Sequence, residues 1–296
     1  MKDVLVIYKK SAYQIYVRER KNERIRQLVE RDDRTVRSIL AADRDHVETL
    51  EETRAALRDL GVKSAFRYRS DEELVEGYDL VVTVGGDGTL LWASHRVPST
   101  VPVLAINSAP DHSVGYFCGG RKGSVRETLA RALAGELRPT TLTRMKVEID
   151  GRLVHRRVLN DALFCHRSPA ATTRYIIRHR DVEETQKSSG IWIGPAAGST
   201  AAQRSAGGRV LPPSSRRLQY VVREPYIPPE GSYQLRRGLV GAHEKLFVDS
   251  QIREGVVFLD GPHVMHEVPI GSELTFSRSD EPLNLLAFPR ARIPED

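Results

Sequence analysis

The sequence predicts two kinds of structure: a doubly wound, Rossmann-like α/β domain and, after it, a β-rich domain that we expect to be a β-sandwich. Apolar strand runs alternate with helical patterns over residues 1–140, which is typical of a parallel sheet with helices on its faces. Short strand candidates separated by Gly, Pro and Ser follow, and no helix of similar strength interrupts them. We therefore place the α/β domain at residues 1–140, the β-rich domain at 141–282, and at 283–296 a C-terminal segment that returns to the first domain.

Each element of the first domain follows from its local pattern. Short apolar runs indicate strands buried on both faces of a parallel sheet, and apolar residues three, four and seven apart indicate helices. The expected elements are a strand at Val4–Ile7, helix over most of residues 13–60 with Gly61 as its stop, strands at Leu80–Val84 and Val101–Ile106, and a helix opened by a capping box at Ser124–Glu127 and ended by Gly135.

The β-rich half begins with a hairpin signal, because Asp150-Gly151 supplies the positive φ angles of a tight turn between two apolar runs. Further short runs predict the other strands. These candidates are Arg174–Arg180, Leu218–Val222, Glu244–Val248, Gly255–Leu259, Glu273–Ser277 and Leu283–Phe288.

Composition limits the classes of function. Lys and Arg number 45 and Asp and Glu 39, a net charge of +6, which suits nucleic acid, a membrane surface or a phosphorylated small molecule. We interpret the charged stretch Arg18–Arg37 as a solvated helix face rather than a nucleic-acid arm. No apolar run approaches the roughly 20 residues needed to cross a bilayer. With no signal-peptide pattern and only Cys118 and Cys165, a cytoplasmic protein is expected.

The most informative segment is the string Gly85-Gly86-Asp87-Gly88-Thr89 (GGDGT) after the buried run Leu80–Val84. Glycines let backbone N–H groups approach a ligand closely, and a strand-to-helix junction is an anion-binding position. Asp87 could orient a hydroxyl, take its proton or help hold a divalent ion. The alternative is a tight turn in which Asp87 only caps the helix. The spacing matches neither a Walker loop nor a dinucleotide fingerprint.

In this context GGDGT resembles the superfamily of NAD kinases, diacylglycerol and sphingosine kinases, and phosphofructokinases. Further motifs resemble NAD kinases in particular, and they run in the expected order over nearly the whole chain. These motifs are Asn107 with Gly115-Tyr116-Phe117, separated by an insertion around Ala109–Ser113, then Leu159-Asn160-Asp161, Gly198-Ser199-Thr200-Ala201, and Ser205-Ala206-Gly207-Gly208.

Within NAD kinases, three strings resemble the divergent branch that contains the plant NADH kinase and the animal mitochondrial NAD kinase. They are Lys187–Gly190, Ala196–Ala202 and Arg223–Pro225. The resemblance implies an NAD kinase-like fold and transfer of a phosphoryl group to the 2′-hydroxyl of the adenosine ribose of NAD⁺ or NADH. It implies ATP as the usual donor, with a divalent metal, normally Mg²⁺, carried on the nucleotide. It also implies a homodimer or homotetramer, with no nucleic-acid or membrane partner.

The resemblance assigns a role to each matching residue. Asp87 is the base or orienting carboxylate, and the other binding residues divide between phosphate, adenine, ribose and the rest of the dinucleotide. Gly86, Gly88 and Thr89 cradle phosphate through backbone amides, and Asn107 belongs to the Tyr116-Phe117 segment that encloses adenine. Asn160 and Asp161 fix the ribose hydroxyls and the adenine end, and Thr200, Ala201 and Ser205 line the dinucleotide site. Lys187 lies toward phosphate and Ser189 toward nicotinamide.

Other readings of these residues stay open. Asn160-Asp161 could serve a turn, Tyr116 and Phe117 could be core aromatics, and Gly198-Ser199-Thr200 could be a helix N-cap. For Lys187 and Arg174, contact with phosphates and a position on the solvated surface are both open. No histidine spacing predicts a metal site.

The chain departs from the commoner bacterial pattern at three positions on the nicotinamide side. Ser189 replaces an acidic residue, Ala202 replaces a tyrosine, and Pro262 follows Asp260-Gly261 in place of a polar residue. Loss of a carboxylate removes a partner for the positive nicotinamide ring, so our hypothesis is tolerance of NADH; the preference is open, as is the donor, ATP or polyphosphate.

Three rival functions differ from the NAD(H) kinase in a testable way. A lipid or sugar kinase of the same superfamily would not be expected to carry Asn160-Asp161 and Gly198–Ala201. A non-catalytic dinucleotide sensor would tolerate loss of Asp87, which is intact, and a nucleic-acid binder should show a clustered basic, aromatic-interleaved face.

Overall fold

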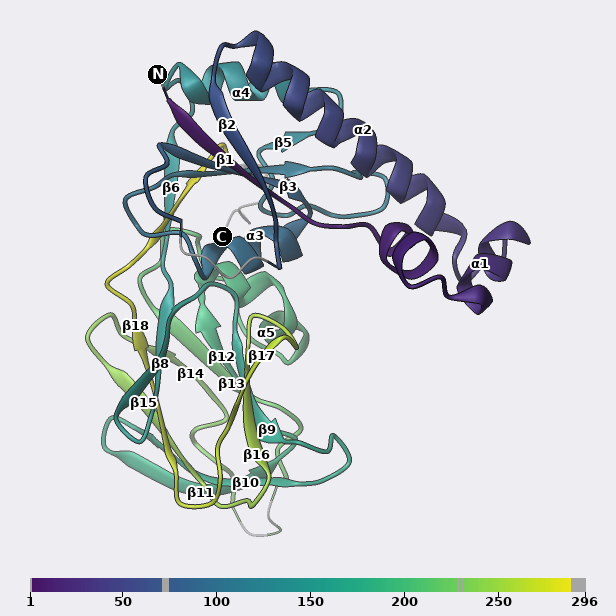
Figure 1. Cartoon of the computed structure of the whole chain (residues 1–296). Helices are drawn as coiled ribbons and strands as arrows, with labels where there is room; N and C mark the ends of the chain where they lie inside the picture. Colours follow the sequence, from purple (N-terminus) through teal and green to yellow (C-terminus); the bar gives the residue numbers. More distant parts are fainter. Residues whose placement is uncertain (1, 71–74, 228, 230, 289–296) are drawn as a thin grey trace. The chain divides into compact units, whose positions relative to one another are not determined.

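The computed structural model describes residues 2–70, 75–227, 229 and 231–288. The chain forms two compact units: one runs to Thr140 and includes the segment from Asn284, and the other is Thr141–Leu283. The first combines a sheet with helices, whereas the second is built almost entirely of strands (Figure 1). The predicted fold class, an α/β domain plus a β-rich domain, is confirmed.

The first unit follows the alternation of strand and helix patterns. Its strands are β1 (Asp3–Tyr8), β2 (Lys63–Tyr68), β3 (Leu80–Gly85), β4 (Val103–Asn107), β5 (Gly120–Arg121), β6 (Pro139–Leu142), which ends just inside the second unit, and β19 (Leu283–Leu286). Its helices are a π-helix, η1 (Gln14–Glu19), and the α-helices α1 (Glu23–Glu30), α2 (Arg37–Asp59), α3 (Asp87–Ser94) and α4 (Val125–Leu133).

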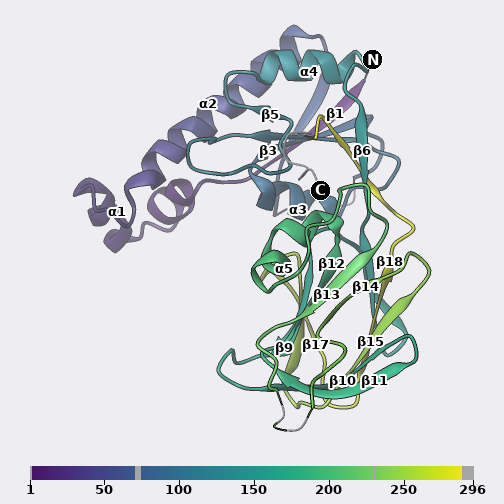
Figure 2. The ribbon, with the colours of Figure 1, turned by 180° about the vertical axis from the view of Figure 1, so that it is seen from behind.

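The sheet of this unit is mainly parallel and is buried on both faces. In the described residues its order is β2-β1-β3-β4-β19-β6, with β5 also paired to β4. One face packs Val4, Val82 and Ile106 against α2 and α4, and Figures 1 and 2 show these two helices on one side of the sheet and α3 on the other. Because β1, β3 and β4 are parallel, their carboxyl ends lie at one edge of the sheet, where open α/β sheets bind ligands.

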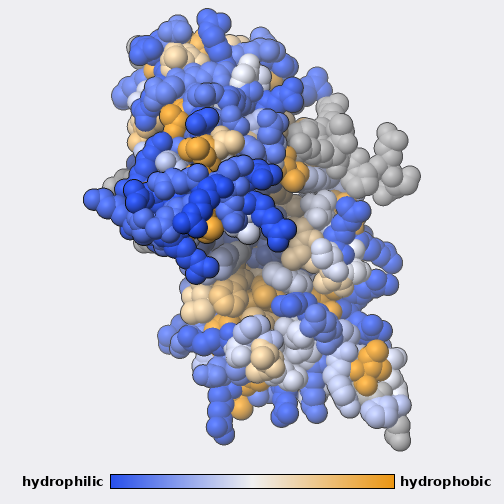
Figure 3. Space-filling model, turned by 90° about the vertical axis from the view of Figure 1, so that its right-hand side faces the viewer, coloured by the Kyte–Doolittle hydropathy of each residue, from blue (hydrophilic) through white to orange (hydrophobic). Residues whose placement is uncertain are grey.

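The long helical pattern of residues 13–60 is divided into η1, α1 and α2. Neither η1 nor α1 buries a residue, and Figure 3, which faces the side where α1 projects, shows a largely hydrophilic surface. Gly61, with φ +65°, follows the C-terminus of α2 as expected. The described part of the chain contains no helix that is both long and apolar enough to cross a membrane.

The predicted capping box at Ser124 is wrong, although α4 does begin at Val125. The Ser124 side chain makes no cap hydrogen bond, because its hydroxyl donates to the Arg121 carbonyl oxygen instead. The Val125 amide donates to the Glu52 carboxylate of α2. A tertiary partner therefore supplies what the local motif was expected to supply.

The second unit consists of two antiparallel sheets. In the described residues their orders are β11-β10-β15-β18-β7-β8 and β14-β13-β12-β9-β16-β17. The first sheet contains β7 (Met145–Ile149), β8 (Arg152–Val158), β10 (Thr173–His179), β11 (Val182–Ser188), β15 (Lys245–Ser250) and β18 (Glu273–Arg278). The second contains β9 (Ala162–His166), β12 (Ile191–Pro195), β13 (Leu218–Val222), β14 (Arg237–Val240), β16 (Gly255–Leu259) and β17 (Val264–Glu267). A 3₁₀-helix, η2 (Ala196–Thr200), and α5 (Ala202–Ser205) follow β12.

One apolar core joins these two sheets into a sandwich. It contains Tyr175 and Phe276 from the first sheet and Phe164 and Ile193 from the second. The rings of Phe164 and Tyr175 meet edge to face with centroids 6.2 Å apart, a favourable aromatic geometry. The β7–β8 turn has φ +51° at Asp150 and +72° at Gly151, as the hairpin signal predicted.

Candidate active site

The GGDGT string forms the turn between β3 and α3. Gly86 is the N-cap of α3 and has an extended conformation. A Cβ atom on Gly85 would lie 2.1 Å from Thr89 Oγ1, and one on Gly86 would lie 2.7 Å from Ser113 Oγ. Glycine at these two positions is therefore a matter of space, because neighbouring side chains occupy the positions that a Cβ atom would need.

Asp87 is the first residue of α3, but it does not cap its own helix. Its Oδ2 accepts a hydrogen bond from the Tyr116 amide at 2.8 Å, and its Oδ1 accepts one from the Phe117 amide at 2.9 Å. The capping alternative is thus wrong. The half-buried carboxylate is oriented by a loop 29 and 30 residues further along the chain, and each oxygen keeps lone-pair capacity for another donor.

Thr89 differs from the expected phosphate cradle. Its amide donates to the Gly86 carbonyl oxygen at 2.9 Å, so that N–H group is already used within the turn. Its hydroxyl oxygen is buried and has no hydrogen-bond partner among the described residues. Gly88, which is exposed and has open space where a Cβ would be, is the accessible glycine of the string.

Asn107, at the end of β4, organises the loop that holds Asp87. Its Nδ2 donates to the Ser113 carbonyl oxygen at 2.8 Å, and its Oδ1 accepts from the Ala109 amide at 3.2 Å. A Cβ on Gly115, which has φ +55°, would lie 2.4 Å from Asn107 Nδ2. The side chain predicted to bind substrate is therefore turned, at least in part, toward its own loop.

His46 of α2 supports the start of the same loop. Its ring is buried, with Nδ1 2.8 Å from Ser108 Oγ and Nε2 2.7 Å from the Lys9 carbonyl oxygen. A carbonyl only accepts, so Nε2 carries the proton and Nδ1 accepts from the serine. Burial, the main cause, lowers the pKa of His46 to about 4. A neutral imidazole therefore connects Lys9, the residue after β1, to Ser108, the residue after β4.

Tyr116 and Phe117 belong to an aromatic cluster with Phe288. The Tyr116 ring lies edge-on to both partners, with centroids 5.1 Å from Phe117 and 5.8 Å from Phe288. Phe117 is buried, whereas Tyr116 is half-buried. Phe117 thus matches the core-aromatic reading, and Tyr116 is the ring that remains accessible to a ligand.

In the second unit, Asn160 and Asp161 lie in a turn held by Asp260. The Asp260 carboxylate accepts from the amides of Leu159 at 2.8 Å, Asn160 at 2.6 Å and Asp161 at 3.0 Å. The Asp260 amide in turn donates to the Asp161 carbonyl oxygen. Asp260 itself has φ +50°, a conformation that aspartate tolerates better than most residues.

This turn carries two polar groups in unusual states. Burial first, and then the nearby Asp260 charge, raise the pKa of Asp161 to about 7. The side-chain oxygen of Asn160 is buried without a hydrogen-bond partner among the described residues. An unsatisfied buried acceptor costs roughly 1–3 kcal/mol, so this atom is suited to receive a donor from a ligand.

The second glycine signature lies against the backbone of Asn160. A Cβ on Gly198 would be 1.7 Å from the Asn160 carbonyl oxygen, and one on Gly194 would be 2.2 Å from it. Gly198 lies in η2, and its carbonyl accepts from the Ala201 amide. The structure therefore brings Thr200 and Ala201, at the end of η2, into the neighbourhood of Asn160, with Ser205 exposed at the end of α5.

Lys187 and Ser189 are not brought beside Asn160 within the unit. β9 pairs with β12 so that Ala162 faces Ile193, while Phe164 faces Ile191. Extending this register places Ser189 opposite His166 at the far end of β9, about 16 Å from Asp161 at 3.3 Å per residue. Lys187 pairs with Arg174 across β10 and β11; both are exposed.

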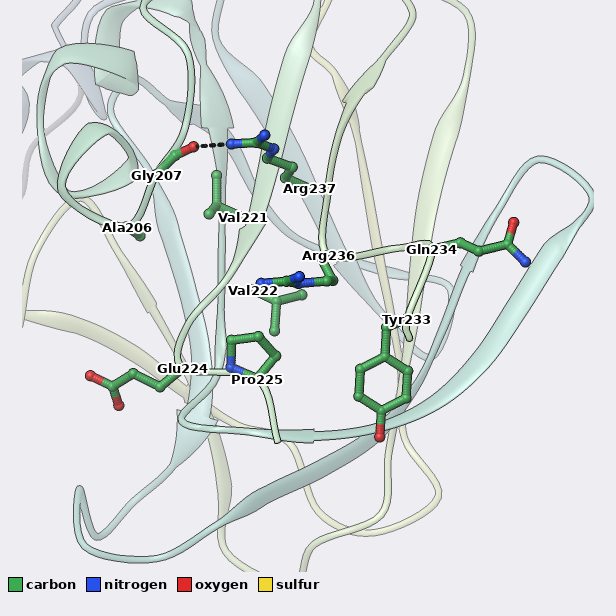
Figure 4. Close-up of a pocket in the computed structure, with 10 residues that line it drawn as sticks. All are labelled: Ala206, Gly207, Val221, Val222, Glu224, Pro225, Tyr233, Gln234, Arg236 and Arg237. Atoms are coloured by element: carbon green, nitrogen blue, oxygen red, sulfur yellow. Dashed lines mark hydrogen bonds between the residues drawn. The ribbon is translucent and has the colours of Figure 1, made fainter. Parts of the chain in front are cut away.

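Sequence reasoning missed Asp260 as the residue that positions the Asn160 turn, and it missed a cavity of 540 Å³ beside β13 and β14 (Figure 4). The pair Arg236-Arg237, two exposed arginines at the start of β14, was the available signal for the cavity. This cavity is lined by Ala206, Gly207, Val221, Val222, Glu224, Pro225, Tyr233, Gln234, Arg236 and Arg237.

No group of three or more His, Cys, Asp or Glu side chains within the described ranges could hold a metal ion. The donor set around Asp87, a single carboxylate already accepting two amides, does not form a cation cage of the kind that Mg²⁺ or Ca²⁺ prefers.

Comparison with known proteins places these features in a family. The model of the ATP-NAD kinase N-terminal domain matches residues 4–137. A rice protein named probable NADH kinase is 35% identical over 268 residues, which are 83% of this chain and 82% of the relative. The NADH kinase of Arabidopsis thaliana is 35% identical over 231 residues, 71% and 72% of the two chains.

Solved structures share the fold over almost the whole chain. An NAD kinase from Archaeoglobus fulgidus in complex with ATP has a TM-score of 0.65 at 21% identity and covers 96% of this chain and 92% of its own. Yeast NADH kinase complexed with NADH has a TM-score of 0.67 at 14% identity, with 97% and 83% covered. The chain therefore has the fold of these two proteins. The chain belongs to the NAD kinase family, and it is a kinase.

Proposed function

We propose that this kinase transfers the γ-phosphoryl group of ATP to the 2′-hydroxyl of the adenosine ribose of NAD(H), and that it takes NADH as well as NAD⁺. The observation that carries the proposal is Asp87, an oriented carboxylate in a glycine-rich strand-to-helix turn at the carboxyl edge of a parallel sheet. Family membership supports the reaction, and the NADH kinases of rice and Arabidopsis support the reduced dinucleotide as acceptor.

In the proposed step, the ribose O2′ attacks the γ-phosphorus while the bond from the γ-phosphorus to the oxygen bridging it to the β-phosphate breaks. ADP leaves with that electron pair, and the O2′ proton passes to Asp87. Positioning and charge stabilisation provide most of the rate in such transfers. The two amides on Asp87 hold the carboxylate still, so little reorganisation is needed when the hydroxyl arrives.

The donor and acceptor are assigned to different groups of residues. The N-terminus of α3, with Gly86 and Gly88, receives the ATP phosphates, since helix N-termini favour anions. Tyr116 contacts adenine. Asn160 and Asp161 bind the adenine end and the ribose hydroxyls, and the unpartnered oxygen of Asn160 supports that role.

The nicotinamide end is assigned to Ser189 and a phosphate contact to Lys187, with Thr200, Ala201 and Ser205 lining the dinucleotide site between them. The distance of Ser189 from Asp161 along β9 suits the two ends of an extended dinucleotide. Ser189 is a neutral residue where the commoner pattern has a carboxylate, so the neutral ring of NADH loses nothing there.

A divalent metal, Mg²⁺, would be bound by the ATP phosphates, because the described residues offer no group of side chains that could hold a metal ion. Bound there, it would neutralise charge on the transferring group. We also propose that the protein is a homodimer or homotetramer and that it is cytoplasmic. The cytoplasmic location is supported by two cysteines that are not joined in a disulfide.

The test is to incubate the purified protein with ATP, Mg²⁺ and either NAD⁺ or NADH, and to measure NADP⁺ or NADPH. We expect both acceptors to be phosphorylated, with kcat/KM for NADH at least comparable to that for NAD⁺. A strong preference for NAD⁺ would contradict the reading of Ser189. Turnover of diacylglycerol or a sugar, but not of either dinucleotide, would replace the proposal by the rival kinase.

A further inference from the structure

Four arginines from four separate segments of the second unit line one cavity of 370 Å³, here called the arginine pocket. Arg180 lies in the turn between β10 and β11, and Arg209 lies in the loop after α5. Arg217 immediately precedes β13, and Arg237 begins β14. Gln219, Gly238 and Leu239 complete the lining.

The positive charge of this pocket is mostly uncompensated. Arg180 binds Glu244 through Nε at 3.0 Å and Nη2 at 3.4 Å. Within the part of the chain that the structure describes, Arg209, Arg217 and Arg237 form no ion pair. Once Glu244 is set against Arg180, three arginines of the lining remain without an ion-pair partner among the described residues, which favours a multiply charged anion.

The form of the lining selects the kind of anion. Guanidinium groups bind phosphate in a forked, bidentate geometry, and a volume of 370 Å³ is near the lower end for ligand sites. Among the described residues of the lining, Leu239 is the one apolar side chain, and none carries an aromatic ring that could stack on a base. The pocket is therefore suited to a chain of phosphates rather than to a whole nucleotide.

Buried amide groups connect this pocket to the turn that carries Asn160. Gln219 Oε1 accepts from the Arg209 amide at 2.7 Å, and Gln219 Nε2 donates to Gln203 Oε1 at 3.0 Å. Gln203 Nε2 then donates to the Asn160 carbonyl oxygen at 3.5 Å. Both glutamines are almost fully buried, so a movement of Arg209 would change the hydrogen-bond partners of a buried polar network.

A hydrogen bond from Arg237 to the backbone adds a second connection. Its Nη1 donates to the Gly207 carbonyl oxygen at 2.9 Å, the contact drawn in Figure 4. The Gly208 amide donates to the Gln203 carbonyl oxygen at 2.8 Å. An anion that draws Arg237 into the pocket therefore competes with a contact that holds the loop after α5.

We propose that the arginine pocket is an effector site for a phosphate-chain anion, such as pyrophosphate, and that its occupancy changes dinucleotide affinity through Gln219, Gln203 and Asn160. The binding part stands on the pocket alone. The coupling part rests on the proposed function, because it requires the dinucleotide to bind at Asn160.

The binding part is tested by calorimetric titration of the full chain with sodium pyrophosphate. Arg209→Ala/Arg217→Ala is compared with Arg204→Ala/Arg216→Ala, which removes the same charge from exposed positions outside the pocket. We expect affinity to fall roughly tenfold or more in the pocket variant, since charge-assisted hydrogen bonds are lost, and to stay within about twofold in the control. Equal losses in the two variants, or none, would overturn the site.

The same titration with ATP decides the source of the phosphates. A wild-type binding step that disappears only in the pocket variant extends the site to nucleotide phosphates, whereas an unchanged ATP titration assigns it to free phosphate chains.

The coupling part is tested by NADH fluorescence titration with and without saturating pyrophosphate. We expect the NADH Kd of the wild type to change about fivefold or more and that of the pocket variant to stay constant. A constant wild-type Kd despite pyrophosphate binding refutes the coupling and leaves the site. Failure of NADH to bind at all refutes the proposed function, while the pyrophosphate titration still reports on the pocket.

Discussion

The pKa of Asp161 should make dinucleotide binding depend on pH. Its pKa is raised to about 7, mainly by burial and further by Asp260. The carboxylate can accept hydrogen bonds from ribose hydroxyls with both oxygens only when it is ionised. We expect the KM for the dinucleotide to fall about tenfold between pH 6 and pH 8, because the ionised fraction rises through the pKa. Initial rates across this range measure it, and a flat KM would contradict the role of Asp161.

Asp260 is a positioning residue, and its removal should be visible in that same pH profile. Asp260→Asn leaves one acceptor oxygen for three amides, which costs about 1–3 kcal/mol for an unpaired group. It also removes the charge that helps raise the pKa of Asp161. We expect a higher dinucleotide KM and a profile displaced to lower pH. A purely structural role would weaken binding without displacing the profile.

At this scale the sequence predicts residue identity better than residue contacts. Asp87 and Asn160-Asp161 stand out locally because glycines and a strand end surround them. The partners of Asp87 lie about 30 residues away, and Asp260 lies about 100 residues from the turn that it holds. No local pattern encodes such pairings, so the orienting amides and the role of Asp260 were accessible only from the structure.

At the scale of elements, the glycines of the β3–α3 turn separate packing from ligand binding. Gly88 has open space at its Cβ position, whereas a Cβ on Gly85 would collide with Thr89 Oγ1. We expect Gly88→Ala to keep the wild-type Tm within a few degrees but to raise the KM for ATP severalfold, because the methyl group occupies the proposed phosphate position.

Gly85→Ala is the matched comparison, and it should lower the Tm clearly, since strain in a packed turn costs about 1–3 kcal/mol. Thermal unfolding and ATP kinetics of both variants measure these effects. An unchanged ATP KM in Gly88→Ala would remove Gly88 from the phosphate site.

Strand prediction succeeded at several apolar runs but missed β9 and β12, which are also apolar and are buried or half-buried throughout, and it missed strands that carry no apolar pattern. β13 and β16 coincide with their predicted ranges. β11 has the sequence VEETQKS and lies at a sheet edge, so its residues lack the alternation that betrays a strand. The capping box failed for the related reason that Glu52, distant in sequence, supplies the hydrogen bond.

At the scale of the whole molecule, buried titratable groups make stability depend on pH. His46 has a folded-state pKa of about 4, lowered mainly by burial, against about 6.5 in an unfolded chain. Below pH 6.5 the unfolded state binds a proton that the folded state does not bind. The contribution of the neutral His46 to stability is therefore lost as pH falls toward 4.

We expect the stability advantage of the wild type over His46→Gln to shrink by about 2 kcal/mol between pH 7 and pH 5. Urea unfolding of both proteins at these two pH values gives the difference directly. Comparison against the variant is needed because the raised pKa of Asp161 acts in the opposite direction over the same range. A constant difference would mean that the imidazole is not held neutral.

The fold class was predictable because each half of the chain carries a uniform pattern: alternating strands and helices, then strands alone. The net charge of +6 indicated an anionic partner without identifying it. The structure places part of that positive charge in the arginine pocket. Residues distant in sequence form this pocket together, and no sequence motif marks it.

The central claim is that Asp87 serves a transfer of phosphate from ATP to the ribose 2′-hydroxyl of NAD(H). The most direct measurement is the steady-state rate of NADPH formation from NADH and ATP by the wild type and by Asp87→Asn, with dinucleotide binding measured in both. We predict that the wild type produces NADPH and that the variant binds NADH but is slower by about 10² or more. Wild-type turnover by the variant, or no NADPH from a folded wild type that binds both ligands, would contradict the account.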